Sequence, residues 1–166
     1  MQKIGISPAG AADKYAFLWA NRLLDNHANA PQIEIGMGGF TARFSNATQV
    51  AITGADSAIY LNQQPVASWR TVSVAAGDEL HIAQPKAGVF NYLAFARGLI
   101  ADMQFGSAST SVREKLGPNA GCALGAGQDV QYQAGHANER ASRNVNPAYI
   151  PDYSKLLTLR LIPGFQ

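Results

Sequence analysis

The sequence predicts a mostly-β protein, an antiparallel β barrel with one main α-helix and a short second helix. Three observations lead to this fold class. One stretch near the start carries apolar residues at helical spacing. From residue 32 onward, apolar residues alternate at a period of two in short runs. Turn-forming residues separate these runs closely enough for hairpins, which disfavours a doubly wound parallel sheet.

The main helix is expected from Asp13 to about Asp25. Asp13 is a suitable N-cap because its carboxylate can accept hydrogen bonds from the free amides of the first turn. Ala16, Ala20 and Leu23 recur near helical spacing. They predict an apolar helix face that packs on a sheet.

Short strands follow in close succession. The alternating residues predict them around Ile33 to Ile35, Phe40 to Phe44, Val50 to Ile52, Ile59 to Leu61, Val66 to Trp69, Val72 to Val74 and Leu80 to Ile82. Turns are expected at residues 62–65 and 77–78. Val89 to Ala96 is almost continuously apolar, which is typical of a strand buried on both faces.

The chain changes in texture after Gly98. Ser109 to Lys115 is expected to form the short second helix, and Val130 to Gln133 the last strand of a domain that spans residues 1–134. Residues 135–155 are polar and are predicted to be a linker. Residues 156–166 resume an apolar alternation, so we expect them to begin a second half that this chain lacks. That segment should dock on another chain or on its own barrel edge.

Composition disfavours several functional classes. Of the 166 residues 14% are charged, with a net charge of +2 and scattered basic residues, so nothing favours a nucleic-acid partner. No run approaches the roughly 18 apolar residues of a membrane span, and the start does not resemble a secretory signal. The single Cys122 fits a reducing compartment, and we expect a cytoplasmic protein. His27, His81 and His136 lie too far apart in sequence to predict a metal site.

The candidates for chemistry are three small polar loops, at residues 7–13, 53–56 and 105–110. The sequence has no phosphate-binding loop, nucleophile elbow or paired zinc ligands. Each polar loop combines backbone freedom with exposed amides and a hydroxyl or carboxylate, which are the components of oxyanion and phosphate sites. The alternative is structural, in which Asp13 and residues 107–111 only cap helices.

The order and spacing of several segments resemble one family. The segments are Ser-Pro-Ala-Gly-Ala-Ala-Asp at 7–13, Ala-Asn-Arg-Leu-Leu-Asp-Asn at 20–26, Gln-Ile-Glu-Ile at 32–35, Thr-Gly-Ala-Asp at 53–56, Tyr-Leu-Ala at 92–94 and Gly-Ser-Ala-Ser-Thr at 106–110. Together they resemble the family that contains the C subunit of 5-oxoprolinase, the antagonist of a sporulation-kinase inhibitor and the carboxyltransferase domain of urea carboxylase. This family is also called allophanate hydrolase subunit 2. The resemblance implies a cyclophilin-like β architecture.

The resemblance also implies a function. It is that of one subunit of an ATP-dependent 5-oxoprolinase-type enzyme, which acts with a subunit-B-like partner on a lactam or urea-like N–H beside a carbonyl. ATP then belongs to the assembled complex, and this chain alone binds no cofactor or metal. The implied catalytic residues are Asp56 and Asp13, and the implied substrate-binding residues are Ser7, Gly10, Thr53, Gly54, Ser107, Ser109, Thr110 and Arg113. Backbone amides of residues 54–56 or 106–109 would hold the oxyanion.

Departures from the family pattern leave alternatives open. The family has an arginine where this chain has Ala108, so Arg97 or Arg113 would have to hold an anion in its place. The family's first strand and second half are also missing from this chain. The alternatives are therefore a regulatory binding module that grips a partner protein without chemistry, or a truncated inactive copy. Self-association through the final leucine-rich segment is also expected.

Overall fold

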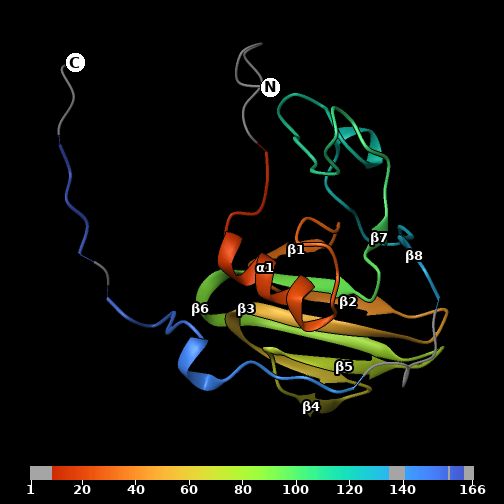
Figure 1. The fold of residues 1–166 in the computed structure, drawn as a ribbon, viewed down its shortest axis with the longest axis horizontal. Coiled ribbons are helices and arrows are strands. Elements are labelled where there is room, and N and C mark those ends of the chain that lie inside the picture. Colours follow the sequence, from red (N-terminus) through yellow and green to blue (C-terminus); the bar gives the residue numbers. More distant parts are fainter. Residues whose placement is uncertain (1–8, 135–140, 157, 163–166) are drawn as a thin grey trace.

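The computed structural model describes residues 9–134, 141–156 and 158–162, in which one α-helix lies on an antiparallel sheet (Figure 1). The helix is α1 (Lys14–Leu23). The strands are β1 (Ile33–Gly36), β2 (Phe40–Arg43), β3 (Thr48–Leu61), β4 (Gln64–Val66), β5 (Arg70–Val74), β6 (Glu79–Phe95), β7 (Leu99–Ile100) and β8 (Gln131–Tyr132). Two short 3-10 turns are η2 (Asn119–Gly121) and η3 (Pro147–Tyr149).

The main sheet is organised around its two long strands, β3 and β6, which pair with each other. The outer edge of β6 pairs with β1 and β2, and the outer edge of β3 pairs with β4 and β5. All these pairings are antiparallel, which confirms the predicted mostly-β class. The expected closed barrel is wrong for the described strands, because this sheet is open. Its long strands bend at bulges, so the sheet curves without its edges pairing.

The bend in β3 corrects a second expectation. Residues 53–56 were expected to leave a short strand as a loop, but they lie inside the 14-residue strand β3. The register with β6 shifts between Gly54 and Asp56, and twice more before Ile59. Buried polar side chains keep this stretch paired: the Ser57 hydroxyl donates to Asn91 Oδ1 at 2.7 Å, and Asn91 Nδ2 donates to the Ala55 carbonyl at 2.8 Å. The predicted strands at Leu80 to Ile82 and Val89 to Ala96 likewise merge into β6.

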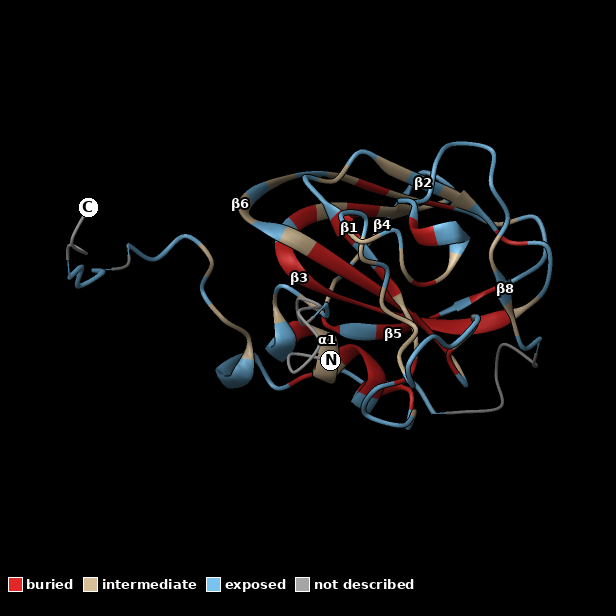
Figure 2. Ribbon diagram, turned by 90° about the horizontal axis from the view of Figure 1, so that it is seen from above, coloured by how far each residue is buried: buried red, intermediate tan, exposed pale blue. Residues whose placement is uncertain are grey.

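The sheet is buried on both faces over its central part, as Figure 2 shows in red. One face packs an aliphatic and aromatic cluster that includes Ile52, Leu93 and Phe95. The opposite face receives α1, whose buried residues contact Ala51 and Tyr92. Burial on both faces explains the continuous apolar run predicted at the end of β6. Each large apolar side chain buried here contributes about 1.5–3 kcal/mol.

Helix α1 begins and ends at recognisable capping residues. The Asp13 carboxylate accepts a hydrogen bond from the Ala16 amide at 3.0 Å, which confirms the predicted N-cap. At the other end, Asp25 has φ of 51°, and the Asn26 amide donates to the Asn21 carbonyl at 3.0 Å. This pattern is a Schellman motif, so the helix stops before the predicted limit.

Residues 101–130 form an excursion of turns between β7 and β8 (Figure 1, green to teal). The predicted strand near residue 131 is confirmed as β8, which pairs with β7. The helix expected from Ser109 to Lys115 is wrong. Ser111 and Leu116 instead form an antiparallel bridge that closes a turn, in which Lys115 has φ of 52° and Ser111 donates to the Glu114 carboxylate. Positive φ at a non-glycine residue is incompatible with continued helix.

The structure describes part of the expected linker at residues 135–155. Residues 135–140 lie outside the described residues, but residues 141–153 pack along the domain. Val145 is 3% exposed, its amide donates to the Trp69 carbonyl at 2.9 Å, and the Thr71 amide donates to the Arg143 carbonyl at 2.8 Å. The backbone of residues 143–145 therefore follows the sheet beside β5, where it exchanges hydrogen bonds with the backbone of Trp69 and Thr71.

The described residues of the apolar segment near the end of the chain do not form a strand. Residues 156 and 158–162 carry no described sheet pairing, and Leu156 and Leu161 are 96% and 85% exposed. The prediction that residues 156–161 form a strand is therefore wrong for the described part, and they do not dock on this chain's own sheet edge. Within the described residues, no helix is long and apolar enough to cross a membrane.

Candidate functional site

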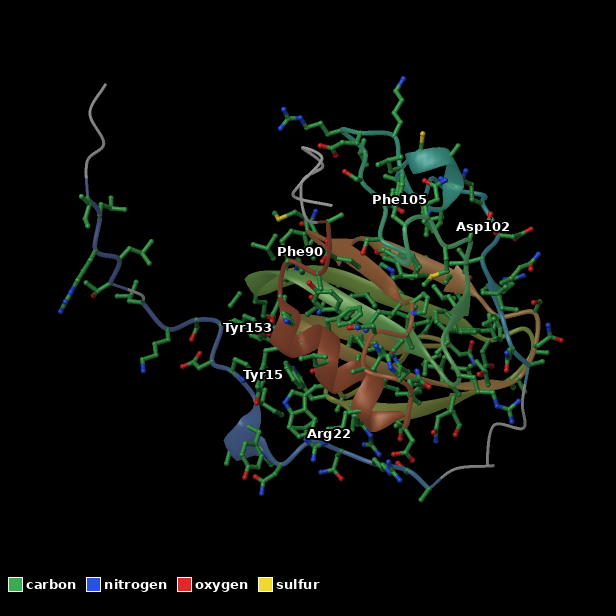
Figure 3. The ribbon with its side chains drawn as sticks, turned by 45° about the horizontal axis from the view of Figure 1, so that its top comes forward. Tyr15, Arg22, Phe90, Asp102, Phe105 and Tyr153 are labelled. Carbon is green, nitrogen blue, oxygen red and sulfur yellow. The ribbon has the colours of Figure 1, made fainter. Side chains whose placement is uncertain are left out.

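A hollow of about 240 Å³ lies between the segment before α1 and the loop at residues 104–117. It is lined by Ala9, Gln104, Phe105, Ser107, Ser109, Ser111, Leu116 and Gly117. Figure 3 shows Phe105 on this loop, beyond the sheet. The hollow therefore brings together two of the three polar loops that the sequence singled out.

Two tight turns build the wall of the hollow. In the first, Gln104 and Ser107 exchange backbone hydrogen bonds of 2.9 and 3.0 Å across Phe105 and Gly106, whose φ values are 51° and 75°. In the second, Gly117 has φ of 99°, and a Cβ there would lie 2.3 Å from the Ser109 carbonyl oxygen. Glycine is therefore required at this contact. The Gly117 amide donates to Gln104 Oε1 at 2.9 Å, which ties the turns together.

The lining of the hollow keeps several hydrogen-bond donors free. The Ser107 hydroxyl accepts a bond from the Ser109 amide at 3.1 Å, so its own proton remains available. The Ser109 hydroxyl and the Gln104 side-chain NH₂ have no partner among the described residues. The Ser111 hydroxyl, in contrast, is bound to Glu114. Hydroxyl and amide donors in a partly apolar hollow suit a carbonyl oxygen, or the oxyanion derived from it.

A second polar cluster lies where α1 begins. The buried Tyr92 hydroxyl accepts a hydrogen bond from the Asp13 amide at 2.7 Å and donates to Glu34 Oε2 at 2.7 Å. The same Glu34 oxygen accepts a bond from the Ala12 amide at 2.8 Å. On its outer side, Asp13 Oδ2 accepts a bond from the Tyr153 hydroxyl at 2.6 Å. Two phenols and two carboxylates therefore fix the backbone between the hollow and the helix.

Both phenols of this cluster keep their protons. Burial, followed by the hydrogen bond to Glu34, raises the pKa of Tyr92 well above its usual value near 10. Burial, followed by the hydrogen bond to Asp13, likewise raises the pKa of Tyr153. The phenols act as donors to carboxylates. The Asp13 carboxylate is already bonded to Tyr153 and to the Ala16 amide, so its position serves structure.

The hollow includes only some of the residues that the resemblance implied. Ser107 and Ser109 line it, and Gly10 is exposed beside the lining residue Ala9. Thr110 and Arg113 are exposed residues of the same excursion and are not part of the lining. Ser7 lies outside the described residues.

The expected loop at residues 53–56 is divided by the bend in β3. Thr53 is fully buried, and its hydroxyl donates to the Ala16 carbonyl at 2.7 Å. A Cβ on Gly54 would lie 2.3 Å from the Phe90 carbonyl oxygen, so this glycine is packed against β6. Thr53 and Gly54 are therefore not open to a substrate here. Asp56 is exposed opposite Ala87 and does not line the hollow.

Sequence reasoning missed Gln104, Glu34 and the hydroxyls of Tyr92 and Tyr153. One signal was available for Tyr92, because a phenol inside a continuous buried strand needs a hydrogen-bond partner. Nothing local pointed to Tyr153, whose partner Asp13 is distant in sequence. Within the described residues, no group of three or more His, Cys, Asp or Glu side chains could hold a metal ion.

The chain is similar to known proteins over nearly its whole length. A family model described as "Carboxyltransferase domain, subdomain A and B" matches residues 4–166. The C subunit of the 5-oxoprolinase of Haemophilus influenzae is 35% identical over 136 residues, which are 82% of this chain and 44% of that protein. The urea amidolyase of Lachancea kluyveri is 35% identical over 150 residues, which are 90% of this chain and 8% of that protein.

Solved structures agree with these relatives. The urea amidolyase of K. lactis matches with a TM-score of 0.74 at 28% identity, over 89% of this chain and 9% of that one. The urea carboxylase of Kluyveromyces lactis matches with a TM-score of 0.73 at 28% identity, over 93% of this chain and 14% of that one. This chain thus spans less than half the length of each of these proteins.

Proposed function

The chain belongs to the carboxyltransferase domain family (subdomain A and B), and from this premise we propose that it is the carboxyltransferase-like part of an ATP-dependent enzyme. We propose further that the enzyme acts on the N–H and C=O of a lactam or urea-like substrate, together with a subunit-B-like partner. The names of the relatives, a 5-oxoprolinase and a urea amidolyase, support this class of substrate. ATP is assigned to the other subunits of the assembled enzyme.

The observation that carries the proposal is the set of free donors in the hollow. Ligand pockets for drug-sized molecules span about 300–1,000 Å³, so a hollow of about 240 Å³ suits a smaller molecule. Ser107, Ser109 and Gln104 offer protons to it, while Phe105 and Leu116 supply apolar walls. A lactam or urea is a small molecule with a carbonyl oxygen beside its N–H, and hydroxyl and amide donors in the hollow suit that oxygen.

The donors have a chemical role in such a reaction. When the substrate N–H loses its proton, negative charge spreads onto the neighbouring carbonyl oxygen. Hydroxyl and amide donors placed at this oxygen bind it more strongly as the charge grows, which lowers the barrier. Ser107 and Ser109 are the proposed donors, and Gln104 supports them.

The described residues that line the hollow include no carboxylate, so the proposed proton acceptor lies outside this lining. Within this chain, Asp56 is the candidate, since both oxygens of Asp13 already accept hydrogen bonds. Asp56 is exposed and has no described partner, so its carboxylate is free to face a neighbouring subunit. Because Asp56 does not line the hollow, it can act as the base only if the substrate is bound at an interface between subunits.

The test is turnover by the reconstituted complex of this chain with its partner subunits. Replacing one oxyanion donor lowers kcat by roughly 100-fold or more in well-studied enzymes, so Ser109→Ala should lower ATP-dependent conversion of 5-oxoproline by about that factor. Thr110→Ala is the matched control, because Thr110 lies in the same loop but outside the lining. Equal turnover of Ser109→Ala and Ser107→Ala with the unmodified complex would overturn the assignment.

A binding module without chemistry is the second candidate, and one observation favours it. Met103, Phe105 and Val112 are 61%, 66% and 60% exposed on the excursion at residues 101–130. Large exposed apolar side chains in one loop region are typical of protein interaction surfaces. If the unmodified complex shows no ATP-dependent turnover, and Phe105→Ser abolishes partner binding, this candidate becomes the better one.

A further inference from the structure

Residues 141–153, here called the strap, follow the domain from the edge of β5 to the start of α1. The strap begins with a bridge between Arg70 and Asn144 and with the buried side chain of Val145. Farther along, the Tyr149 ring lies 6.2 Å from that of Trp19, and the Tyr15 hydroxyl donates to the Tyr149 carbonyl at 2.7 Å.

The strap ends at Tyr153, which occupies a notch in the sheet. A Cβ added to Gly88 would lie 3.0 Å from Cδ1 of Tyr153 and 2.9 Å from the Ala55 side chain. Gly88 has φ of 82°, so the bend in β6 and the missing side chain together leave room for the ring. From this notch the Tyr153 hydroxyl reaches Asp13 Oδ2 at 2.6 Å, and Figure 3 shows the residue beside the start of α1.

Asp13 is the last residue of the site loop, defined here as residues 9–13. The inner side of this loop is held by Tyr92 and Glu34, which bind the amides of Asp13 and Ala12 at 2.7 and 2.8 Å. Its outer side is held by Tyr153 alone among the described hydrogen bonds. The other end of the loop, Ala9, lines the hollow. The docked strap and the hollow are therefore joined through five residues of backbone.

We propose that Tyr153 is a positioning residue, and that the docked strap holds the site loop in the place that the hollow requires. The proposal rests on the function assigned to the hollow above, but its physical part concerns this chain alone. When Tyr153 is docked, the site loop is fixed from both sides and Ala9 keeps its position in the wall. When the strap leaves the notch, the loop loses its outer contact and the substrate must order it on binding, which weakens affinity.

Hydrogen–deuterium exchange on the full chain tests the physical part. Tyr153→Phe removes only the hydroxyl, and Gly88→Ala narrows the notch while keeping Tyr153. Both should speed exchange of peptides from residues 9–17 by roughly 10-fold, because loss of one hydrogen bond to a charged group opens the loop locally. In Tyr153→Phe the β3 peptides should stay unchanged, whereas the Cβ of Gly88→Ala also meets Ala55 in β3. Tyr149→Phe is the control, since Tyr149 is 59% exposed and its hydroxyl has no described partner.

Two results would overturn the strap proposal. One is unchanged exchange of residues 9–17 in Tyr153→Phe, and the other is equal acceleration across the whole domain, which indicates a merely structural role. In the reconstituted complex, Tyr153→Phe should raise the KM for 5-oxoproline about 5–10-fold and leave kcat within about twofold, as expected when only pre-organisation is lost. Absence of turnover by the unmodified complex overturns the proposed function but not the exchange result, so the two failures are distinguishable.

Discussion

Tyr92→Phe should destabilise the protein without changing its core packing. The ring of Tyr92 is fully buried against α1 and lies 6.1 Å from the ring of Phe17 in an edge-to-face arrangement, which phenylalanine keeps. Only the hydroxyl is lost. With it go the hydrogen bond donated to Glu34 and the acceptor for the Asp13 amide, at 2.7 Å each.

The expected loss follows from these two bonds. A hydrogen bond to a charged group contributes about 1.5–3 kcal/mol, and an unpartnered buried amide costs about 1–3 kcal/mol. Glu34 is exposed, so water can replace the donor that it loses, and the lower ends of these ranges apply. We therefore expect the free energy of unfolding to fall by about 2 kcal/mol. With a urea slope of about 2 kcal/mol per molar, the midpoint should fall by about 1 M.

Urea unfolding followed by far-ultraviolet circular dichroism measures this change, and the slope should stay constant. Tyr149→Phe serves as control, because it removes an exposed hydroxyl without a described partner and should leave the midpoint within about 0.2 M. A loss below about 0.5 kcal/mol in Tyr92→Phe would show that the buried phenol bridge contributes little, and the reasoning about the α1 start would be wrong.

Four further outcomes are expected. Gly54→Ala should lower the melting temperature by roughly 10 °C in a thermal scan, because φ of Gly54 is 103° and the new Cβ would lie 2.3 Å from a carbonyl oxygen. Gly10→Ala is the control and should leave the melting temperature unchanged, because its Cβ meets nothing within 4 Å; equal melting temperatures of the two variants would refute this. The raised pKa of Tyr92 means that the folded protein favours the neutral phenol, so its contribution to the free energy of unfolding is complete below the unfolded pKa of about 10 and is lost as the pH rises above it. The free energy of unfolding should therefore fall between about pH 8 and 11, and fall less in Tyr92→Phe; an equal fall in both proteins would contradict this. Asp56→Asn should lower turnover of the reconstituted complex roughly 100-fold without unfolding, and unchanged turnover would exclude Asp56 as base. Sedimentation velocity should detect self-association that Leu159→Lys weakens, while a monomer that binds no partner would count against it.

The sequence predicted those parts of the fold that have local causes. The start of α1 could be predicted because the Asp13 carboxylate accepts a hydrogen bond from an amide of the first turn, and because apolar residues at helical spacing follow it. The run that ends β6 is continuously apolar because both faces of the sheet are covered there. The polar segments also predicted the family, which the family match confirms.

Other parts have causes that lie far along the chain. Residues 53–56 have the composition of a turn, but Asn91 and Ser57 supply the hydrogen bonds that keep them within β3. Ser109 to Lys115 resembles a capped helix locally, yet the bridge between Ser111 and Leu116 closes it as a turn. In both places, tertiary partners override the local preference.

The candidate site was predicted only in part, because some of its residues depend on partners that are distant in the sequence. Ser107 and Ser109 were identified by their loop composition, and both line the hollow. Asp56 was expected at a strand end and lies instead on the exposed side of a bulged strand. Tyr153 carries no local signal, since its role depends on the notch at Gly88 and on a carboxylate from the other end of the chain.

The role of the hollow can be seen directly in a crystal structure of the assembled enzyme with 5-oxoproline or urea bound, together with a non-hydrolysable ATP analogue. We expect the substrate carbonyl oxygen in the hollow, within about 3 Å of the Ser107 or Ser109 hydroxyl. A substrate bound elsewhere, with the hollow filled by side chains of the partner, would contradict it.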